Sequence, residues 1–246
     1  LENDRTDEIG ALTDSFNCML DRINTLVNQV YQQELAQKNA EIEALQAQIN
    51  PHFLYNTLDS VNWMLIARGE MDISAVVVAL GKLMQYSMDT ARAMVSLEEE
   101  YRNVRDYLMI QKNRLEDRLE FTLELDEPLK CFPVPKLILQ PLVENAIKYG
   151  IEPSLQPGHI LVRTRKTDDD IQILVKDNGC GMDEAQLTFY RRLLRNDLSG
   201  QTNIGVRNVA RRLQLHFGGR CGFNVSSRPG DGLSITIRIP AQEEQS

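Results

Sequence analysis

Hydrophobic residues near the start of the chain recur every three or four positions, which is the period of one face of a helix. The members of this stripe are Ile9, Leu12, Phe16, Leu20, Ile23, Val27 and Val30 and, after a change of phase near residues 31–35, Ile42, Leu45, Ile49 and Phe53. One helix cannot bury so narrow a seam by itself, so we expect a parallel coiled coil between two copies of the chain. Pro51 should kink this long helix, because proline removes a backbone donor and clashes with the preceding turn.

Two further helices are predicted before residue 118. An apolar helix should run over residues 73–92, after a stop signal at Gly69. Residues 96–99 (Ser-Leu-Glu-Glu) have the form of a capping box and open a helix whose apolar stripe continues to Leu115. We expect no strand in this part of the chain.

The pattern changes after Arg118, where apolar and polar residues alternate from Leu119 to Leu125 as in a half-buried strand. The elements predicted next are a helix over residues 137–149, strands over 160–166 and 171–176, a polar Arg-rich stretch over 183–203, a helix over 206–217, and strands over 223–228 and 233–239. Helices packed on one face of a mostly antiparallel sheet form an α+β sandwich. The expected fold class is therefore a helical dimerisation region followed by an α+β sandwich.

Composition and charge narrow the classes of protein. The 246 residues suffice for one or two domains, and a formal net charge of −8 argues against a nucleic-acid partner, which needs clustered positive charge. Four scattered cysteines and three histidines predict neither a zinc site nor a disulfide framework, and they favour a reducing compartment. The longest apolar run, residues 75–80, is too short for a membrane helix. Because the chain begins at Leu1 without a methionine or a signal peptide, we expect a fragment of a longer protein.

Three short motifs in the second half carry candidate chemistry: residues 139–149 (LQPLVENAIKY), residues 177–182 (DNGCGM) and residues 203–208 (NIGVRN). Each alone is weak, because an Asp-x-Gly-x-Gly run usually marks a turn and a single asparagine is commonly a helix-surface amide. In this order and spacing, the three motifs resemble the Bergerat ATP-binding fold shared by histidine kinases, gyrase, Hsp90 and MutL. The resemblance covers about residues 118–240.

This resemblance implies a role for each motif residue. Asp177 would accept a hydrogen bond from the adenine amino group, while Gly179 and Gly181 would let the backbone approach the base. Asn145 would supply an amide oxygen to Mg²⁺ bridging the phosphates of ATP. The other nucleotide-binding candidates are Lys148 and the residues that open the last predicted helix, Gly205, Val206 and Arg207. The resemblance also makes Glu144, next to Asn145, a predicted catalytic residue.

The region between the last two motifs would be the ATP lid of this fold. It carries Arg191, Arg192 and Arg195, which could bind phosphate or simply form a solvated helix face. Hydrolytic members of the superfamily place a glutamate four residues before the Mg²⁺-binding asparagine, where it activates water. Pro141 occupies that position here, which argues for phosphoryl transfer to a protein acceptor.

The acceptor candidate lies in residues 48–58 (QINPHFLYNTL), which closely resemble the phosphoacceptor motif of LytS/YesM-type sensor histidine kinases. His52 would be the phosphoacceptor, although a lone histidine is more often a helix-surface residue. Phe53 follows where many other kinase families have an acidic residue, so the resemblance assigns no group that deprotonates His52. Asn56 lies one turn further on the same face and could either position a water for phosphatase activity or only pack.

Residues 7–17 resemble the second helix of a HAMP signalling module, so the resemblance to YesM-type kinases spans nearly the whole chain. It implies a partial HAMP helix over residues 1–30, a helical dimerisation and histidine phosphotransfer domain over residues 31–117, and an ATP-binding domain over residues 118–246. Such a protein is the cytoplasmic portion of a membrane-bound two-component kinase, with its membrane segments outside this fragment. Its partners would be a second copy and a response regulator whose aspartate receives the phosphoryl group, and no nucleic acid.

Two alternatives stay open at this point. One is another Bergerat-fold ATPase, against which Pro141 and the motif around His52 both count. The other is a signalling scaffold with an inactive nucleotide site, against which the intact Asp177 and Asn145 count.

Overall fold

The computed structural model describes residues 51–89, 92–167, 169–194 and 204–241, together with scattered positions between residues 16 and 38. The side chains of Pro51 and Ile204 are not described. The chain divides into two compact units, residues 1–54 and 55–246. The scattered positions are helical, but the phase change near residues 31–35 is only partly covered, and Ile42, Leu45 and Ile49 lie outside the described residues. The coiled coil and the kink at Pro51 therefore stay predictions. None of the helices in the described residues combines the length and apolar character needed to cross a bilayer.

Helices α2 (Pro51–Ala67) and α3 (Met71–Met88) are joined by a short turn, which Gly69 makes possible with a φ of +77°. Contacts near both ends show that they run antiparallel. The hydroxyl of Ser74 donates to Asn62 Oδ1 at 2.6 Å, and the hydroxyl of Tyr55 lies 4.0 Å from the sulfur of Met88. Since α3 ends at Met88, the helix predicted over residues 73–92 ends earlier than expected.

Strand β1 (Met94–Ser96) leads directly into helix α4 (Leu97–Leu115), and the predicted capping box is confirmed. The Ser96 hydroxyl accepts from the Glu99 backbone N–H at 3.2 Å, and Glu99 Oε2 accepts from the Ser96 N–H at 3.0 Å. The expectation of no strand before residue 118 was wrong, because β1 pairs antiparallel with β3 (Pro133–Pro135). A strand of three residues is too short to show alternation in the sequence.

The main sheet contains the five longer strands in the order β2-β4-β5-β7-β6. Their bounds are β2 (Leu119–Leu125), β4 (Gly158–Lys166), β5 (Asp170–Asp177), β6 (Gly222–Ser227) and β7 (Leu233–Pro240). Only the β2–β4 pair is parallel, so the prediction of a mostly antiparallel sheet is confirmed. Along the central strands every second side chain is buried, which gives the sheet one apolar face.

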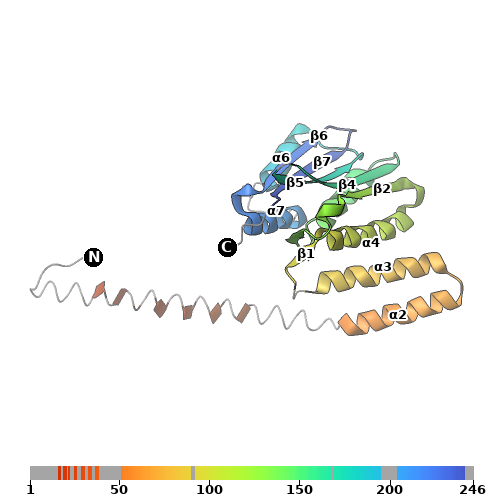
Figure 1. Ribbon diagram of the computed structural model, residues 1–246, viewed down its shortest axis with the longest axis horizontal. Helices are drawn as coiled ribbons and strands as arrows, with labels where there is room; N and C mark the ends of the chain where they lie inside the picture. Colours follow the sequence, from red (N-terminus) through yellow and green to blue (C-terminus); the bar gives the residue numbers. More distant parts are fainter. Residues whose placement is uncertain are drawn as a thin grey trace, which may run out of the picture. The chain divides into compact units, whose positions relative to one another are not determined.

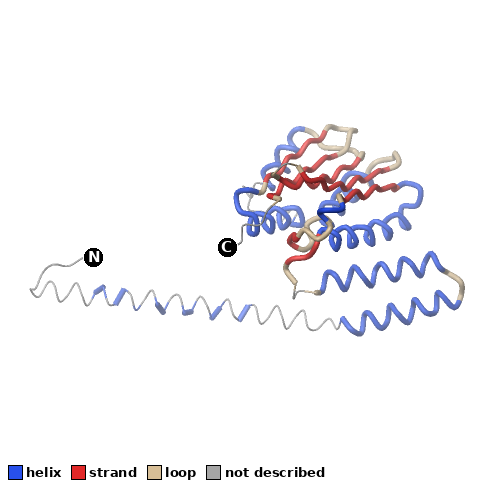
Figure 2. Tube along the Cα trace, viewed as in Figure 1, coloured by secondary structure: helices blue, strands red, loops and turns tan. Residues whose placement is uncertain are grey.

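Helices cover this apolar face and complete the sandwich (Figures 1 and 2). They are α4, α5 (Gln140–Asn145), which continues as a π-helical segment η3 (Ala146–Ile151), and α7 (Ile204–Phe217), with α6 (Glu184–Leu194) packed against α7 and β6. Short 3₁₀ turns lie at η1 (Glu116–Arg118), η2 (Glu127–Leu129) and η4 (Gly218–Arg220). The predicted fold class, a helical region followed by an α+β sandwich, is confirmed.

Further details differ from the sequence prediction. The polar stretch expected over residues 183–203 contains the helix α6, whose buried face is formed by Leu187, Tyr190, Leu193 and Leu194. Helix α4 shares one hydrophobic core with the sheet, although it precedes residue 118. The predicted functional domain boundaries at residues 30 and 117 stay predictions.

The capping box makes a testable contribution to stability. Replacing Ser96 with alanine leaves a backbone N–H of the first turn of α4 without its acceptor. We expect Ser96→Ala to lower the free energy of unfolding by about 1 kcal/mol in urea titrations of the chain. Ser60→Ala, inside α2, is the matched control and should change it by less than about 0.5 kcal/mol. Equal effects of the two substitutions would contradict the capping role.

Candidate functional site

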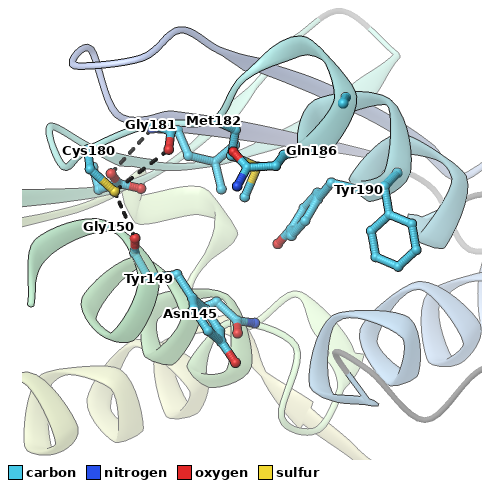
Figure 3. A pocket seen from close by; sticks show the side chains of 12 residues that line it. Asn145, Tyr149, Gly150, Cys180, Gly181, Met182, Gln186 and Tyr190 are labelled. Atoms are coloured by element: carbon cyan, nitrogen blue, oxygen red, sulfur yellow. Dashed lines mark hydrogen bonds between the residues drawn. The ribbon is translucent and has the colours of Figure 1, made fainter. Parts of the chain in front are cut away.

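A cavity of about 520 Å³ opens between the end of α5, the loop after β5 and helix α6 (Figure 3). It is lined by Asn145, Tyr149, Gly150, Asp177, Cys180, Gly181, Met182, Ala185, Gln186, Phe189, Tyr190 and Leu233. The lining is largely apolar, with a few polar groups that converge, which is typical of a small-molecule site. Among the predicted site residues, the cavity brings together Asn145, Asp177 and Gly181.

Asp177 is the last residue of β5, and only 2% of its surface is exposed. Its Oδ1 accepts hydrogen bonds from the backbone N–H of Gly179 at 2.9 Å and of Leu233 at 3.3 Å. Burial raises the pKa of Asp177, while these two backbone donors act in the opposite direction. Because both donors bind Oδ1, the orientation of the carboxylate is held and Oδ2 is the oxygen available to a ligand.

The glycines after Asp177 are required by close contacts between chain segments. A Cβ on Gly181, whose φ is +67°, would lie 1.9 Å from the carbonyl oxygen of Arg228. A Cβ on Gly179 would lie 2.3 Å from the carbonyl carbon of Gly150, so Gly179 packs against backbone and does not line the cavity. The two glycines therefore have a packing role, because any side chain would separate these segments. This role is additional to the predicted one of letting the backbone approach the adenine base.

Asn145 closes α5 and lies at the edge of the cavity. Its amide nitrogen donates to the carbonyl oxygen of Pro141 at 2.8 Å. This bond leaves the amide oxygen Oδ1 as the atom that can meet a cation. Pro141, four residues earlier, provides no carboxylate at the position where the resemblance to the Bergerat fold would place the base of a hydrolytic enzyme.

Several predicted residues lie outside the cavity lining. The Glu144 carboxylate accepts from Gln140 Nε2 at 2.7 Å, and the Gln140 side-chain oxygen accepts from Asn103 of α4 at 2.7 Å. Lys148 is exposed, with its ammonium 5.2 Å from the centre of the Tyr149 ring.

The remaining predicted nucleotide-binding residues belong to the start of α7. Gly205 lies against α5, since a Cβ there would be 3.3 Å from Cβ of Pro141. Val206 is buried and Arg207 is partly exposed, and neither lines the cavity. Of the lid arginines, Arg191 donates to the carbonyl oxygen of Val225 at 3.0 Å, whereas Arg195 lies outside the described residues.

The predicted phosphoacceptor His52 and the neighbouring Asn56 are both exposed on α2. The Asn56 carbonyl oxygen accepts from the Ser60 hydroxyl at 2.7 Å. His52 belongs to the first compact unit, and the cavity belongs to the second.

Sequence reasoning missed the part of the cavity that α6 supplies. Tyr190 is only 4% exposed, its hydroxyl has no hydrogen-bond partner among the described residues, and it points into the cavity (Figure 3). Burial raises the pKa of Tyr190, so its hydroxyl keeps its proton and can donate to a ligand. The spacing of Leu187, Tyr190 and Leu194 is a helical pattern that could have indicated this wall.

The chain matches two families of known proteins. Residues 40–119 match the histidine kinase family, and residues 134–243 match the family of histidine kinase-, DNA gyrase B- and HSP90-like ATPases. The chain is 42% identical over 238 residues to the sensor histidine kinase YesM of Bacillus subtilis, which covers 97% of this chain and 40% of that protein. An uncharacterized sensor-like histidine kinase of Staphylococcus epidermidis is 31% identical over 215 residues, covering 87% of this chain and 41% of that protein.

A solved histidine kinase domain from the blue-light activated histidine kinase of Erythrobacter litoralis is 18% identical, with a TM-score of 0.46, and covers 77% of this chain and 95% of that one. The two matching family regions define an ATP-binding domain of the histidine kinase class preceded by a histidine kinase region. By these matches the chain is similar to sensor histidine kinases such as YesM over nearly its whole length. It spans about two-fifths of the length of the curated relatives named above.

Proposed function

We propose that this chain is the kinase part of a two-component sensor, which transfers the γ-phosphoryl group of ATP to His52 and then to an aspartate of a response regulator. One observation carries the proposal. A cavity bordered by the buried carboxylate of Asp177 and the amide of Asn145 occurs in a chain that also presents the exposed His52. A nucleotide site and an acceptor are the two parts that such a transfer needs.

The polar groups of the cavity suit ATP. Asp177 presents an acceptor oxygen to the adenine amino group, and the Tyr190 hydroxyl needs a partner that a polar ligand would supply. The described residues contain no cluster of three or more His, Cys, Asp or Glu side chains that could hold a metal. The cavity beside Asn145 nevertheless suits Mg²⁺, because this ion is commonly bound through one or two protein oxygens together with substrate phosphates and water. Asn145 Oδ1 would be the protein ligand, and the ion would neutralise phosphate charge.

His52 would act as the nucleophile. An imidazole nitrogen forms a bond to the γ-phosphorus, the bond to the bridging oxygen of ADP breaks, and the imidazole gains the phosphoryl group. In such transfers catalysis consists mostly of positioning and of charge neutralisation. The exposure of His52 on α2 leaves it accessible both to the nucleotide and to a response regulator.

We also propose that the chain works as a parallel homodimer, connected through a HAMP helix over residues 1–30 to membrane segments of a longer protein. Support comes from large apolar side chains that the described single chain leaves exposed on α2 and α3. They include Phe53, Trp63, Met64, Met71 and Ile73, with Trp63 70% exposed. Apolar surface of this extent on neighbouring helices is typical of an interaction site.

The acceptor assignment is tested by His52→Gln. With γ-labelled ATP and Mg²⁺, we expect the unaltered chain to acquire acid-labile label and the variant to acquire none, while both bind ATP alike. His159→Gln, an exposed histidine on β4, is the matched control and should keep its label. Acid-labile label on the His52 variant would place the acceptor elsewhere. Phosphate release without protein label from the unaltered chain would indicate an ATPase.

The base-binding role is tested by Asp177→Asn. The N–H groups of Gly179 and Leu233 require an acceptor, so the new amide oxygen stays with them and its NH₂ group faces the donor amino group of adenine. An unmet buried donor costs roughly 1–3 kcal/mol, so affinity should fall about ten- to a hundredfold. Asp170→Asn, at the opposite end of β5, should leave titrations with ATP unchanged. An equal affinity for Asp177→Asn would remove Asp177 from this role.

The dimer is tested by the molar mass of the chain in solution. We expect twice the 28.1 kDa of one chain at micromolar concentration, and a shift towards the monomer for Trp63→Glu, because a buried charge destabilises an apolar interface. Leu155→Glu is the control, since Leu155 is 99% exposed and lies in the loop between η3 and β4. A monomeric mass for the unaltered chain would contradict the dimer.

A further inference from the structure

A buried carboxylate outside the candidate site binds the backbone that leads into α5. Glu100, on α4, has no exposed surface. Its Oε1 accepts from the N–H of Leu137 at 2.6 Å, and its Oε2 accepts from the N–H groups of Ile138 and Leu139 at 2.9 Å each. Burial raises the pKa of Glu100, and these donors oppose the shift. The carboxylate thus holds three consecutive residues at once.

The backbone at these residues takes a conformation that needs such support. Leu137 has a φ of +60°, in the left-handed region that residues other than glycine rarely adopt. Successive N–H groups that converge in this way form a concave nest for an anion, and Glu100 provides the anion from within the chain.

The bound segment is continuous with Asn145. The carbonyl oxygen of Leu139 accepts from the N–H groups of Leu142 and Val143 at 3.1 Å each, so the first turn of α5 starts from a residue that Glu100 holds. Helix α5 has six residues and ends at Asn145, whose side chain is bonded to Pro141 in the same turn. The position of its start therefore determines where the Asn145 amide lies at the cavity.

The antiparallel pair of helices α2 and α3 supplies a fourth donor to Glu100. The hydroxyl of Tyr86, on α3, donates to Glu100 Oε1. The Tyr86 ring is held from its face by Lys136, whose ammonium lies 4.6 Å from the ring centre. Lys136 directly precedes the three residues that Glu100 binds. Tyr86 thus connects α3, the helix that follows the phosphoacceptor helix α2, to the segment that positions Asn145.

We infer that Glu100 is a positioning residue for the Mg²⁺·ATP site and that the Tyr86 hydroxyl, by completing the donors around Glu100, makes the geometry of Asn145 depend on α3. The inference rests on the proposed function, because it assumes that Asn145 meets Mg²⁺·ATP. Its consequence is that a displacement of α3 that breaks the Tyr86–Glu100 hydrogen bond weakens binding of the metal–nucleotide complex.

Tyr86→Phe tests this inference, because it removes the hydroxyl and keeps the ring beside Lys136. Titration with a non-hydrolysable ATP analogue in Mg²⁺ should show about tenfold weaker binding, the usual consequence of losing one hydrogen bond to a buried charge. In excess EDTA the affinity should equal that of the unaltered chain, since the effect acts through the Mg²⁺ ligand Asn145. Tyr101→Phe is the matched control, because its hydroxyl binds the Glu124 carbonyl and Thr164 in the same core and does not contact Glu100.

A double-mutant cycle separates positioning from general loss of stability. In an Asn145→Ala background, Tyr86→Phe should cause no further loss of Mg²⁺-dependent affinity if it acts through Asn145. Additive losses, an equal loss in EDTA, or an equal loss in Tyr101→Phe would overturn the inference. If the unaltered chain bound no Mg²⁺·ATP, the proposed function itself would be contradicted; if it bound normally and Tyr86→Phe matched it, only the inference would fail.

Discussion

A carboxylate can be buried only where hydrogen-bond donors surround it, and this constraint orders the backbone on two sides of the cavity. Asp177, at the end of strand β5, accepts hydrogen bonds from the N–H groups of Gly179 and Leu233. Glu100 accepts hydrogen bonds from the N–H groups of residues 137–139, just before α5. Apart from the Tyr86 hydroxyl at Glu100, these donors belong to the main chain, which cannot move without breaking the bonds. The cavity walls that carry polar groups are thus positioned by charges that are themselves buried.

The register of the sheet explains why these donors are available to Asp177. Lys176 pairs with Ser234 across β5 and β7, so Leu233 lies beside Asp177, and Ile160 pairs with Asp177 on the other side. The loop after Asp177 then passes so close to Gly150 and Arg228 that it admits no side chain at two positions. This loop therefore lies beside the end of η3, and both segments line the cavity together with Asn145.

Helix α4 has a structural role in the ATP-binding part and a second role at its border. One face joins the core of the sandwich, while Glu100 and Asn103 of the same helix bind the start of α5. The hydrogen bond from Tyr86 brings α3 into this network. The proposed transfer would require the state of the acceptor helices to be related to the nucleotide site. A buried polar connection is suited to this, because losing one of its donors weakens the stabilisation of a buried carboxylate.

The sequence alone determined most of the longer elements, the fold class, the family resemblance and the expectation that Asn145 and Asp177 belong to one site, because periodicity, caps and motif spacing can be read from the sequence itself. The capping box at Ser96 and the strand from Leu119 to Leu125 are examples. Only the tertiary structure decided which motif residues line the cavity, how α6 adds Tyr190, and that Glu100 meets residues 137–139. The reason is physical: these contacts join segments far apart in the chain, and whether a side chain is buried, paired or facing a ligand depends on partners that no local pattern names.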